Sequence, residues 1–441
     1  MPPKPSGKPR RRWRWILAIL AIPGLFFLLQ GGHRVLDALG SAPVRSVRVL
    51  DGSAALPAVA DSGFSRALSA LAEIDLEPGN QVELLIEGPE TLGRIEKDIQ
   101  EARQSVAFQS YFCETGTVAD RLKTLLIAKA RQGVEVLFLR DGFGCNSLGG
   151  SYSDSLTDGG VEVAVVRPLH WYSFHKAQHR SHVRAIVVDG RIGYTGGFGI
   201  ADKWLPRGDT AGWRETTVRF TGPAVTRLAG SFAIAWSEAT GHLLADGRFH
   251  ASPAQPRDGV VAGILFTVRQ YGTPVPERYM ALSLAGARQR VYITNPYFIP
   301  NRELRAWLID AVRRKVDVRV LTTGANVDVR WTRWASRSRY EELLKAGVRI
   351  YEYEPAMLHA KTMVIDGVSS SVGSLNLDNV SLRINDEVVL LVQDRGFGAS
   401  LDSLFLDDLT RADEISLEQF RRRPLIEKLR EPFARMLRDF L

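Results

Sequence analysis

The chain has 441 residues, of which 45% are hydrophobic and 24% are charged, and its formal net charge is +8. A chain this apolar is not disordered, and its length suggests two or three domains with buried cores. Two cysteines are too few for a disulfide scaffold or a four-cysteine zinc site. The positive charge would indicate nucleic-acid binding only if it lay on a folded domain.

Much of this charge lies at the N-terminus, where the first fourteen residues hold six Lys and Arg and no acid. Residues 15–410 are neutral overall, so the sequence predicts no nucleic-acid groove. The apolar run WILAILAIPGLFFLL begins at residue 15 and, with its flanks, is long enough to span a membrane. A retained anchor would leave the tail in the cytoplasm and the body beyond the membrane. A cleaved secretory signal fits the same run, and both interpretations place the chain at a membrane.

Two stretches of the chain repeat one order of strand and helix patterns. ARQSVAFQSYF at 102–112 is similar to ARQRVYITNPYF at 287–298, and each precedes a helical pattern and two further strands. Each series closes on a related motif, HVRAIVVDG at 182–190 or HAKTMVIDG at 359–367. The sequence therefore predicts two duplicated α/β halves with pseudo-twofold symmetry. Mixed β-sheets would be flanked by helices, and the two motifs would share one site at the interface.

Cys113 and Cys145 each follow a predicted strand, SVAFQSYF and VEVLFLRDG. If these strands are parallel neighbours, both cysteines lie at the same edge of the sheet. A disulfide and a pair of free thiols are both compatible with this pattern, and an exported body would permit the disulfide.

The repeated motif brings two histidines and two cations together. On a strand, His182 and Arg184 point to one face, and His359 and Lys361 repeat the arrangement. This set suits covalent phosphoryl transfer, in which one histidine attacks phosphorus and the other exchanges protons with the alcohols. The cations would hold the phosphate oxygens and neutralise charge in the transition state. Neither a metal ion nor a cofactor is expected.

Other motif residues are candidates for supporting roles. Asp189 and Asp366 each precede glycine, which favours a hairpin turn, although as members of the motif they also count as candidate catalytic residues. Gly197 and Ser374 are small residues that would let backbone amides approach an anion, so both are candidate substrate-binding positions.

Two glutamates are candidates for orienting the catalytic histidines. Glu215 lies in WRETTVRF and Glu387 in NDEVVLLV, each opening a strand-like run downstream of a histidine motif. A carboxylate behind an imidazole fixes its tautomer and orientation in other nucleophile and base pairs.

These residues resemble the phospholipase D superfamily, whose signature is a duplicated His-x-Lys-x4-Asp, and within it the bacterial cardiolipin synthases. The resemblance runs from about residue 80 to the end, and Asn376 in SLNLD matches a phosphate-site asparagine of the family. It implies a phosphatidyltransferase of the bacterial inner membrane with phosphatidylglycerol as substrate. His182 would form a phosphohistidine, with release of glycerol, and His359 would act as acid and base. A second phosphatidylglycerol would then accept the phosphatidyl group, giving cardiolipin.

Two departures from the family pattern fall on the first half. Arg184 replaces the lysine of the motif, and Gly199 stands where the family usually has asparagine. Arginine keeps the charge but is bulkier and can bind phosphate bidentately. The alternatives are therefore a phospholipase D-type phosphodiesterase or nuclease, and a catalytically weakened, membrane-bound lipid-binding protein. The sequence gives no prediction of oligomeric state.

The predicted organisation has seven parts along the chain. They are a basic cytoplasmic tail (1–14), a membrane anchor or signal (15–32), a juxtamembrane linker (33–80), the first phospholipase D-like half (81–249), a linker (250–262), the second half (263–410) and a basic amphipathic C-terminal helix (411–441).

Overall fold

The computed structural model describes residues 42–48, 56–169, 179–249, 258–268, 272–424 and 428. The predicted basic tail and membrane anchor, and most of the predicted C-terminal helix, lie outside these residues. Within them, no helix combines the length and the apolar character needed to cross a bilayer.

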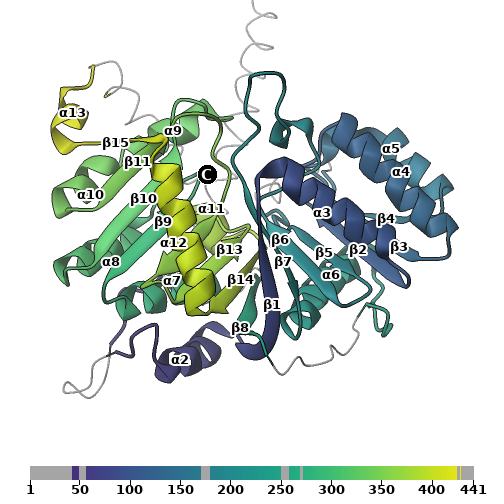
Figure 1. Ribbon diagram of the computed structural model, residues 1–441, viewed down its shortest axis with the longest axis horizontal. Helices are drawn as coiled ribbons and strands as arrows, with labels where there is room; N and C mark the ends of the chain where they lie inside the picture. Colours follow the sequence, from purple (N-terminus) through teal and green to yellow (C-terminus); the bar gives the residue numbers. More distant parts are fainter. Residues whose placement is uncertain are drawn as a thin grey trace, which may run out of the picture.

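One mixed sheet of 15 strands runs through the described part of the molecule (Figure 1). Its order is β15-β11-β10-β9-β12-β13-β14-β8-β1-β7-β6-β5-β2-β3-β4. The first-half strands are β1 (Glu77–Ile86), β2 (Ser105–Ser110), β3 (Glu135–Asp141), β4 (Glu162–Val166), β5 (Ala185–Val188), β6 (Ile192–Gly196) and β7 (Thr216–Thr221). The second-half strands are β8 (Val260–Thr267), β9 (Arg290–Thr294), β10 (Asp317–Thr323), β11 (Arg349–Tyr353), β12 (Thr362–Ile365), β13 (Ser369–Gly373), β14 (Glu387–Gln393) and β15 (Ala412–Glu414).

The order of strands is mirrored about the antiparallel pair β1 and β8. Outward from this pair, the order on one side is β7-β6-β5-β2-β3-β4, and it corresponds strand by strand to β14-β13-β12-β9-β10-β11 on the other side. In the first half β2, β3 and β4 are parallel, and in the second half β9, β10 and β11 are parallel, with the antiparallel β15 outside them; the histidine motif opens an antiparallel hairpin beside each parallel set. This matched order is what an internal duplication predicts, and it confirms the predicted mixed α/β fold.

Helices cover both faces of the sheet. In the first half they are α3 (Glu87–Glu101), α4 (Thr117–Arg131), α5 (Gly149–Asp158) and α6 (Ala224–Thr240). In the second half they are α7 (Val275–Gly286), α8 (Arg302–Arg313), α9 (Arg330–Arg337), α10 (Tyr340–Ala346), α11 (Asn379–Arg383) and α12 (Arg395–Leu409). Two further helices lie outside the halves, α2 (Ser62–Ala72) and α13 (Leu417–Arg422).

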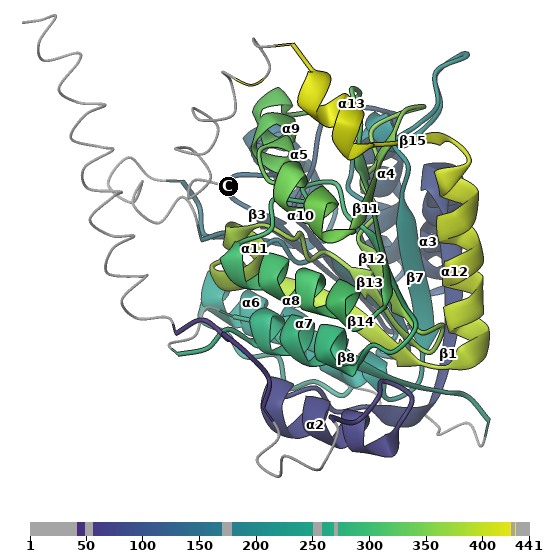
Figure 2. The same cartoon turned by 90° about the vertical axis from the view of Figure 1, so that its left-hand side faces the viewer.

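The apolar side chains form three main clusters around the sheet. One packs α3, α4 and α5 against the first half, and another packs α2, α7, α8 and α10 against the second. The third joins α6 and α12 to strands of both halves, so burial of this apolar surface couples the halves. Figure 2 shows α7 and α8 on one side of the second-half strands and α12 on the other.

Several element boundaries differ from the sequence prediction. Strand β8 begins at Val260, inside the predicted linker 250–262, because Val260 and Val261 belong to an apolar run whose backbone pairs with β1 and β14. Helix α2 and the start of β1 lie within the predicted juxtamembrane linker 33–80. The described part of 411–441 contains β15 and the short α13 where a single helix was predicted.

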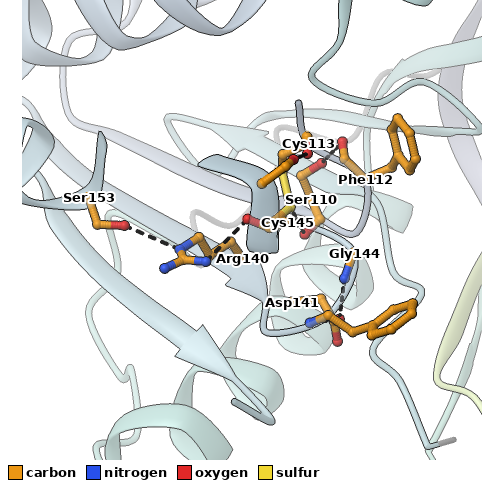
Figure 3. The surroundings of a disulfide bond; sticks show 10 residues. Ser110, Phe112, Cys113, Arg140, Asp141, Gly144, Cys145 and Ser153 are labelled. Carbon is orange, nitrogen blue, oxygen red and sulfur yellow. Dashed lines mark hydrogen bonds between the residues drawn. A yellow bond between two sulfur atoms is a disulfide. The ribbon is translucent and has the colours of Figure 1, made fainter. Parts of the chain in front are cut away.

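Cys113 and Cys145 form a disulfide (Figure 3). They follow the parallel neighbours β2 and β3, so both thiols lie at one edge of the sheet, and the backbone N–H of Cys113 donates to the carbonyl of Gly144 at 3.2 Å. Of the two alternatives that the sequence left open, the structure has the disulfide. It ties together the two segments that leave the carboxyl ends of these strands.

Candidate active site

Two short backbone bridges bring the halves together at the histidine motifs. Ser181 pairs with Asp386, and Leu358 pairs with Arg214. Each bridge joins the residue before a histidine to the residue before a glutamate of the other half. The backbone register therefore places Glu387 beside His182 and Glu215 beside His359.

The side chains complete this exchange. His182 Nδ1 lies 2.9 Å from Glu387 Oε2, and His359 Nδ1 lies 3.0 Å from Glu215 Oε2. All four side chains are buried. With Nδ1 turned to a carboxylate, the Nε2 atom of each ring is the one left to act on a substrate.

The two cations lie beside the imidazoles, as the motif predicts. A guanidinium nitrogen of Arg184 is 3.2 Å from His182 Nε2, and Lys361 Nζ is 3.0 Å from both ring nitrogens of His359. Both cationic side chains are buried, and Arg184 Nε has no hydrogen-bond partner among the described residues. Buried cations with unused donors form a site for an anion.

Burial shifts the protonation of the whole group. It lowers the pKa of His182 and of His359 well below the usual value, and the neighbouring positive charges of Arg184 and Lys361 add to this effect. Burial also lowers the pKa of Lys361 to about 7 and raises the pKa of Glu387 and of Glu215. His182 is therefore neutral in the free protein, which leaves a lone pair available for attack, whereas His359 must gain a proton before it can act as an acid.

The aspartates of the motif lie apart from the histidines, at the far ends of β5 and β12. Asp189 accepts hydrogen bonds from the backbone N–H groups of Arg103, Gln104 and Ser105, and Asp366 does the same for the N–H groups of Arg288, Gln289 and Arg290. Both aspartates have positive φ, 52° and 55°, as the first residue of an Asp-Gly turn. This geometry supports the turn interpretation, and their place among the candidate catalytic residues stays a prediction.

The two predicted small residues contact the glutamates. The backbone N–H of Gly197 donates to Glu215 Oε1 at 3.1 Å, and the hydroxyl of Ser374 donates to Glu387 Oε2. A Cβ on residue 197 would lie 2.3 Å from Glu215 Oε2, so a larger residue here would displace the carboxylate. In the structure these residues hydrogen-bond to the two carboxylates, and their contact with substrate stays a prediction.

Gly199 and Asn376 occupy corresponding places with different surroundings. A Cβ on residue 199 would lie 2.7 Å from the carbonyl oxygen of Phe112 and 2.9 Å from the Trp204 ring, so the asparagine of the family pattern does not fit. Asn376 is buried, and its Oδ1 has no hydrogen-bond partner in the described part of the chain. Its role in phosphate binding stays a prediction.

Sequence reasoning missed the aromatic rings beside the histidines. Tyr111 packs edge-on against His182, and Tyr297, Trp204 and Trp213 surround His359. The two tyrosines stand at equivalent places in the repeat, in SYF and PYF, which is the signal that could have identified them. Nothing comparable in the sequence points to the tryptophans.

Among the described residues, no group of three or more His, Cys, Asp or Glu side chains is arranged to hold a metal ion.

Comparison with known proteins bears on this arrangement. Residues 281–409 match the family model described as cardiolipin synthase, PLD-like domain. Cardiolipin synthase A of Pseudomonas syringae pv. syringae (strain B728a) is 34% identical over 379 residues, covering 85% of this chain and 78% of that protein. The chain belongs to the cardiolipin synthase family of the phospholipase D superfamily.

Other relatives agree with this assignment. Cardiolipin synthase A of Pseudomonas putida (strain GB-1) is 36% identical over 386 residues, again covering 85% of this chain and 78% of that protein. The fold resembles a crystal structure of phosphatidylserine synthase from Haemophilus influenzae Rd KW20, with a TM-score of 0.65 and 15% identity. That likeness covers 85% of this chain and 98% of the other, and at this identity it bears on the fold alone. The similarity to the cardiolipin synthases thus extends over both halves and both histidine motifs.

Proposed function

We propose that this protein is a cardiolipin synthase that transfers a phosphatidyl group between two phosphatidylglycerol molecules through a phosphohistidine. The observation that carries the proposal is the pair of His–Glu couples, each formed across the two halves, with Arg184 and Lys361 beside them. The names of its relatives supply the lipid class.

In the first step, Nε2 of neutral His182 attacks the phosphorus of one phosphatidylglycerol. A P–N bond forms, the P–O bond to glycerol breaks, and protonated His359 gives its proton to the leaving oxygen. Glu387 stabilises the positive charge that develops on His182. Arg184 and Lys361 neutralise the non-bridging oxygens, where negative charge grows in the transition state.

In the second step, a hydroxyl of another phosphatidylglycerol gives its proton to neutral His359 while its oxygen attacks phosphorus. The P–N bond breaks, His182 returns to its neutral form, and cardiolipin leaves. His359 ends protonated, as it began, so protons and bonds balance over the cycle.

Lipid analysis of cells tests this proposal directly. The protein is expressed in cells that lack other cardiolipin synthases, and lipids are measured by mass spectrometry for wild type, His182→Asn and His359→Asn. We expect cardiolipin from wild type and essentially none from either variant, at equal protein levels. The same lipid profile from all three proteins would refute the proposal.

We further propose that residues 15–32 anchor the protein in the bacterial inner membrane, with the catalytic body outside the cytoplasm. The cationic tail before this apolar run supports that orientation, and so does the disulfide, which persists in oxidising compartments. Extraction with alkaline carbonate should leave the full-length protein in the membrane pellet, and protease added to spheroplasts should digest the body. Protection of the body in intact spheroplasts would contradict this topology.

A further inference from the structure

We propose that Trp204 is a positioning residue that holds Glu215 in place behind His359, and that Gly199 is present to admit its ring. The inference rests on the proposed function, because its effect is read through the proton transfer assigned to His359. It concerns a tryptophan that the histidine motif does not contain.

The indole of Trp204 lies beside both the glutamate and the histidine. Its Nε1 is 3.4 Å from Glu215 Oε2, the same oxygen that faces His359 Nδ1, and its ring packs edge-on against the imidazole at 5.5 Å between centroids. Trp204 is fully buried. One side chain thus contacts both members of the couple.

Glycines make room for this tryptophan from three separate segments. A Cβ on Gly88 or on Gly212 would lie 2.2 or 2.3 Å from the carbonyl oxygen of Trp204, and a Cβ on Gly199 would lie 2.9 Å from its ring. Real Cβ atoms do not approach so closely, so larger residues at these places would displace the tryptophan. The position of Trp204 is therefore tightly determined by its surroundings.

The segment that carries Trp204 is also fixed in place. Asp202 accepts hydrogen bonds from the backbone N–H groups of Thr117 and Val118 at the start of α4, at 3.0 and 2.8 Å. The ring of Trp204 further contacts Phe112, Phe198 and Trp213. A rigid support of this kind limits the movement of Glu215 when charge develops on His359.

The two halves hold their glutamates by different means. Glu387 accepts a hydrogen bond from the Ser374 hydroxyl, whereas Glu215 accepts from the backbone N–H groups of Gly197 and Thr216 and from the Trp204 indole. Position 197 has no hydroxyl to offer, so the indole supplies the side-chain donor on this side. The hydrogen bond from Trp204 acts to lower the pKa of Glu215 against the larger effect of burial, and so favours the carboxylate that His359 needs.

The matching test is the substitution Trp204→Phe, which keeps an aromatic ring and removes the N–H donor. With phosphatidylglycerol we expect a roughly tenfold lower kcat and an unchanged KM. The indole would affect the reaction only by way of His359 and would not itself bind the substrate. In a single turnover with a phosphatidyl ester of p-nitrophenol, whose leaving group needs no proton, release of p-nitrophenolate should proceed at the wild-type rate, because the second step, which needs His359 as a base, is not part of that measurement. A purely structural role would impair both substrates equally.

Matched controls separate this effect from general damage. Trp307→Phe removes the N–H of another buried indole, one that donates to no partner among the described residues, and should keep wild-type kcat. Gly199→Ala should reproduce the Trp204→Phe pattern, whereas Gly230→Ala, which has open space around its Cβ, should not.

The outcomes also separate the inference from the proposed function. If wild type forms cardiolipin but Trp204→Phe and Trp307→Phe have equal kcat, the inference is wrong and the function stands. If wild type forms no cardiolipin, the proposed function itself fails.

Discussion

Lys361 shows how burial sets the chemistry of a single residue at this site. Its ammonium group donates to the carbonyl oxygen of His359 at 2.6 Å and lies beside both ring nitrogens of the same residue. Removal from water disfavours the charged form and lowers the pKa of Lys361 to about 7. The positive charge that should bind phosphate is therefore sensitive to pH near neutrality.

We predict that the affinity for an uncleavable phosphonate analogue of the substrate falls as pH rises through about 7. Below this pKa Lys361 is charged in the free protein, and above it binding must first take up a proton. The dissociation constant should therefore rise about tenfold per pH unit until the pKa of the bound state is reached. Calorimetric titration between pH 6 and 9 would measure this slope.

The variant Lys361→Arg provides the control, because arginine stays charged throughout this range. Its affinity for the analogue should be nearly independent of pH over the same interval. An equal slope in both proteins would show that another group is responsible.

At the residue scale, sequence reasoning identified the groups but not their partners. His182, His359, Arg184 and Lys361 were predictable because the motif occurs twice with the same spacing. The pairing of each histidine with the glutamate of the other half was not predictable. It depends on backbone bridges between segments that are far apart in the chain. No repeated pattern in the sequence pointed to Trp204, because its position is determined by tertiary packing.

The hairpins β5–β6 and β12–β13 are the elements that position the motifs. Each turn is anchored by an aspartate that binds three backbone N–H groups at the start of the neighbouring strand, β2 or β9. The aspartate thus fixes one end of the hairpin, and the histidine and the cation lie at the other end. The Asp-Gly pair made these turns predictable, whereas the contact with the neighbouring strand required the fold.

We predict that Asp366→Ala lowers the free energy of unfolding by about 2–3 kcal/mol, because it removes charge-assisted hydrogen bonds and places alanine at positive φ. Its kcat should stay within about twofold of wild type, since the aspartate lies away from the histidines. Denaturant unfolding and steady-state kinetics would measure the two effects.

Asp366→Asn is the milder comparison, because asparagine tolerates positive φ and keeps one acceptor oxygen. It should lose less stability than the alanine variant. A kcat reduced by orders of magnitude in a stably folded Asp366→Asn protein would instead assign the aspartate a part in catalysis.

At the scale of the whole molecule, the site exists only because two halves share one sheet and one interface. The central pair β1 and β8 joins the halves, and the buried ion pair of Arg214 with Asp408 links the start of β7 to α12. The backbone of Arg214 also receives the N–H of His359 at 2.7 Å. Stability of the interface and geometry of the site therefore depend on the same residues.

The mirrored order of strands was predictable in outline from the duplicated motifs. The continuity of the sheet was not predictable, because β1 and β8 begin within segments that the sequence predicts to be linkers. Pairing of these strands depends on partners from the opposite half, which a local pattern does not reveal.

The most direct test of the central claim, two His–Glu couples formed across the halves, is a single-turnover measurement with the p-nitrophenyl phosphatidyl ester. We predict that His359→Asn still releases p-nitrophenolate and accumulates a phosphatidyl-enzyme visible by intact mass, whereas His182→Asn does neither. Because the glutamates are exchanged, Glu215→Gln should behave like His359→Asn, and Glu387→Gln like His182→Asn. The reverse assignment of the two glutamate variants, or a covalent enzyme adduct in His182→Asn, would contradict the account.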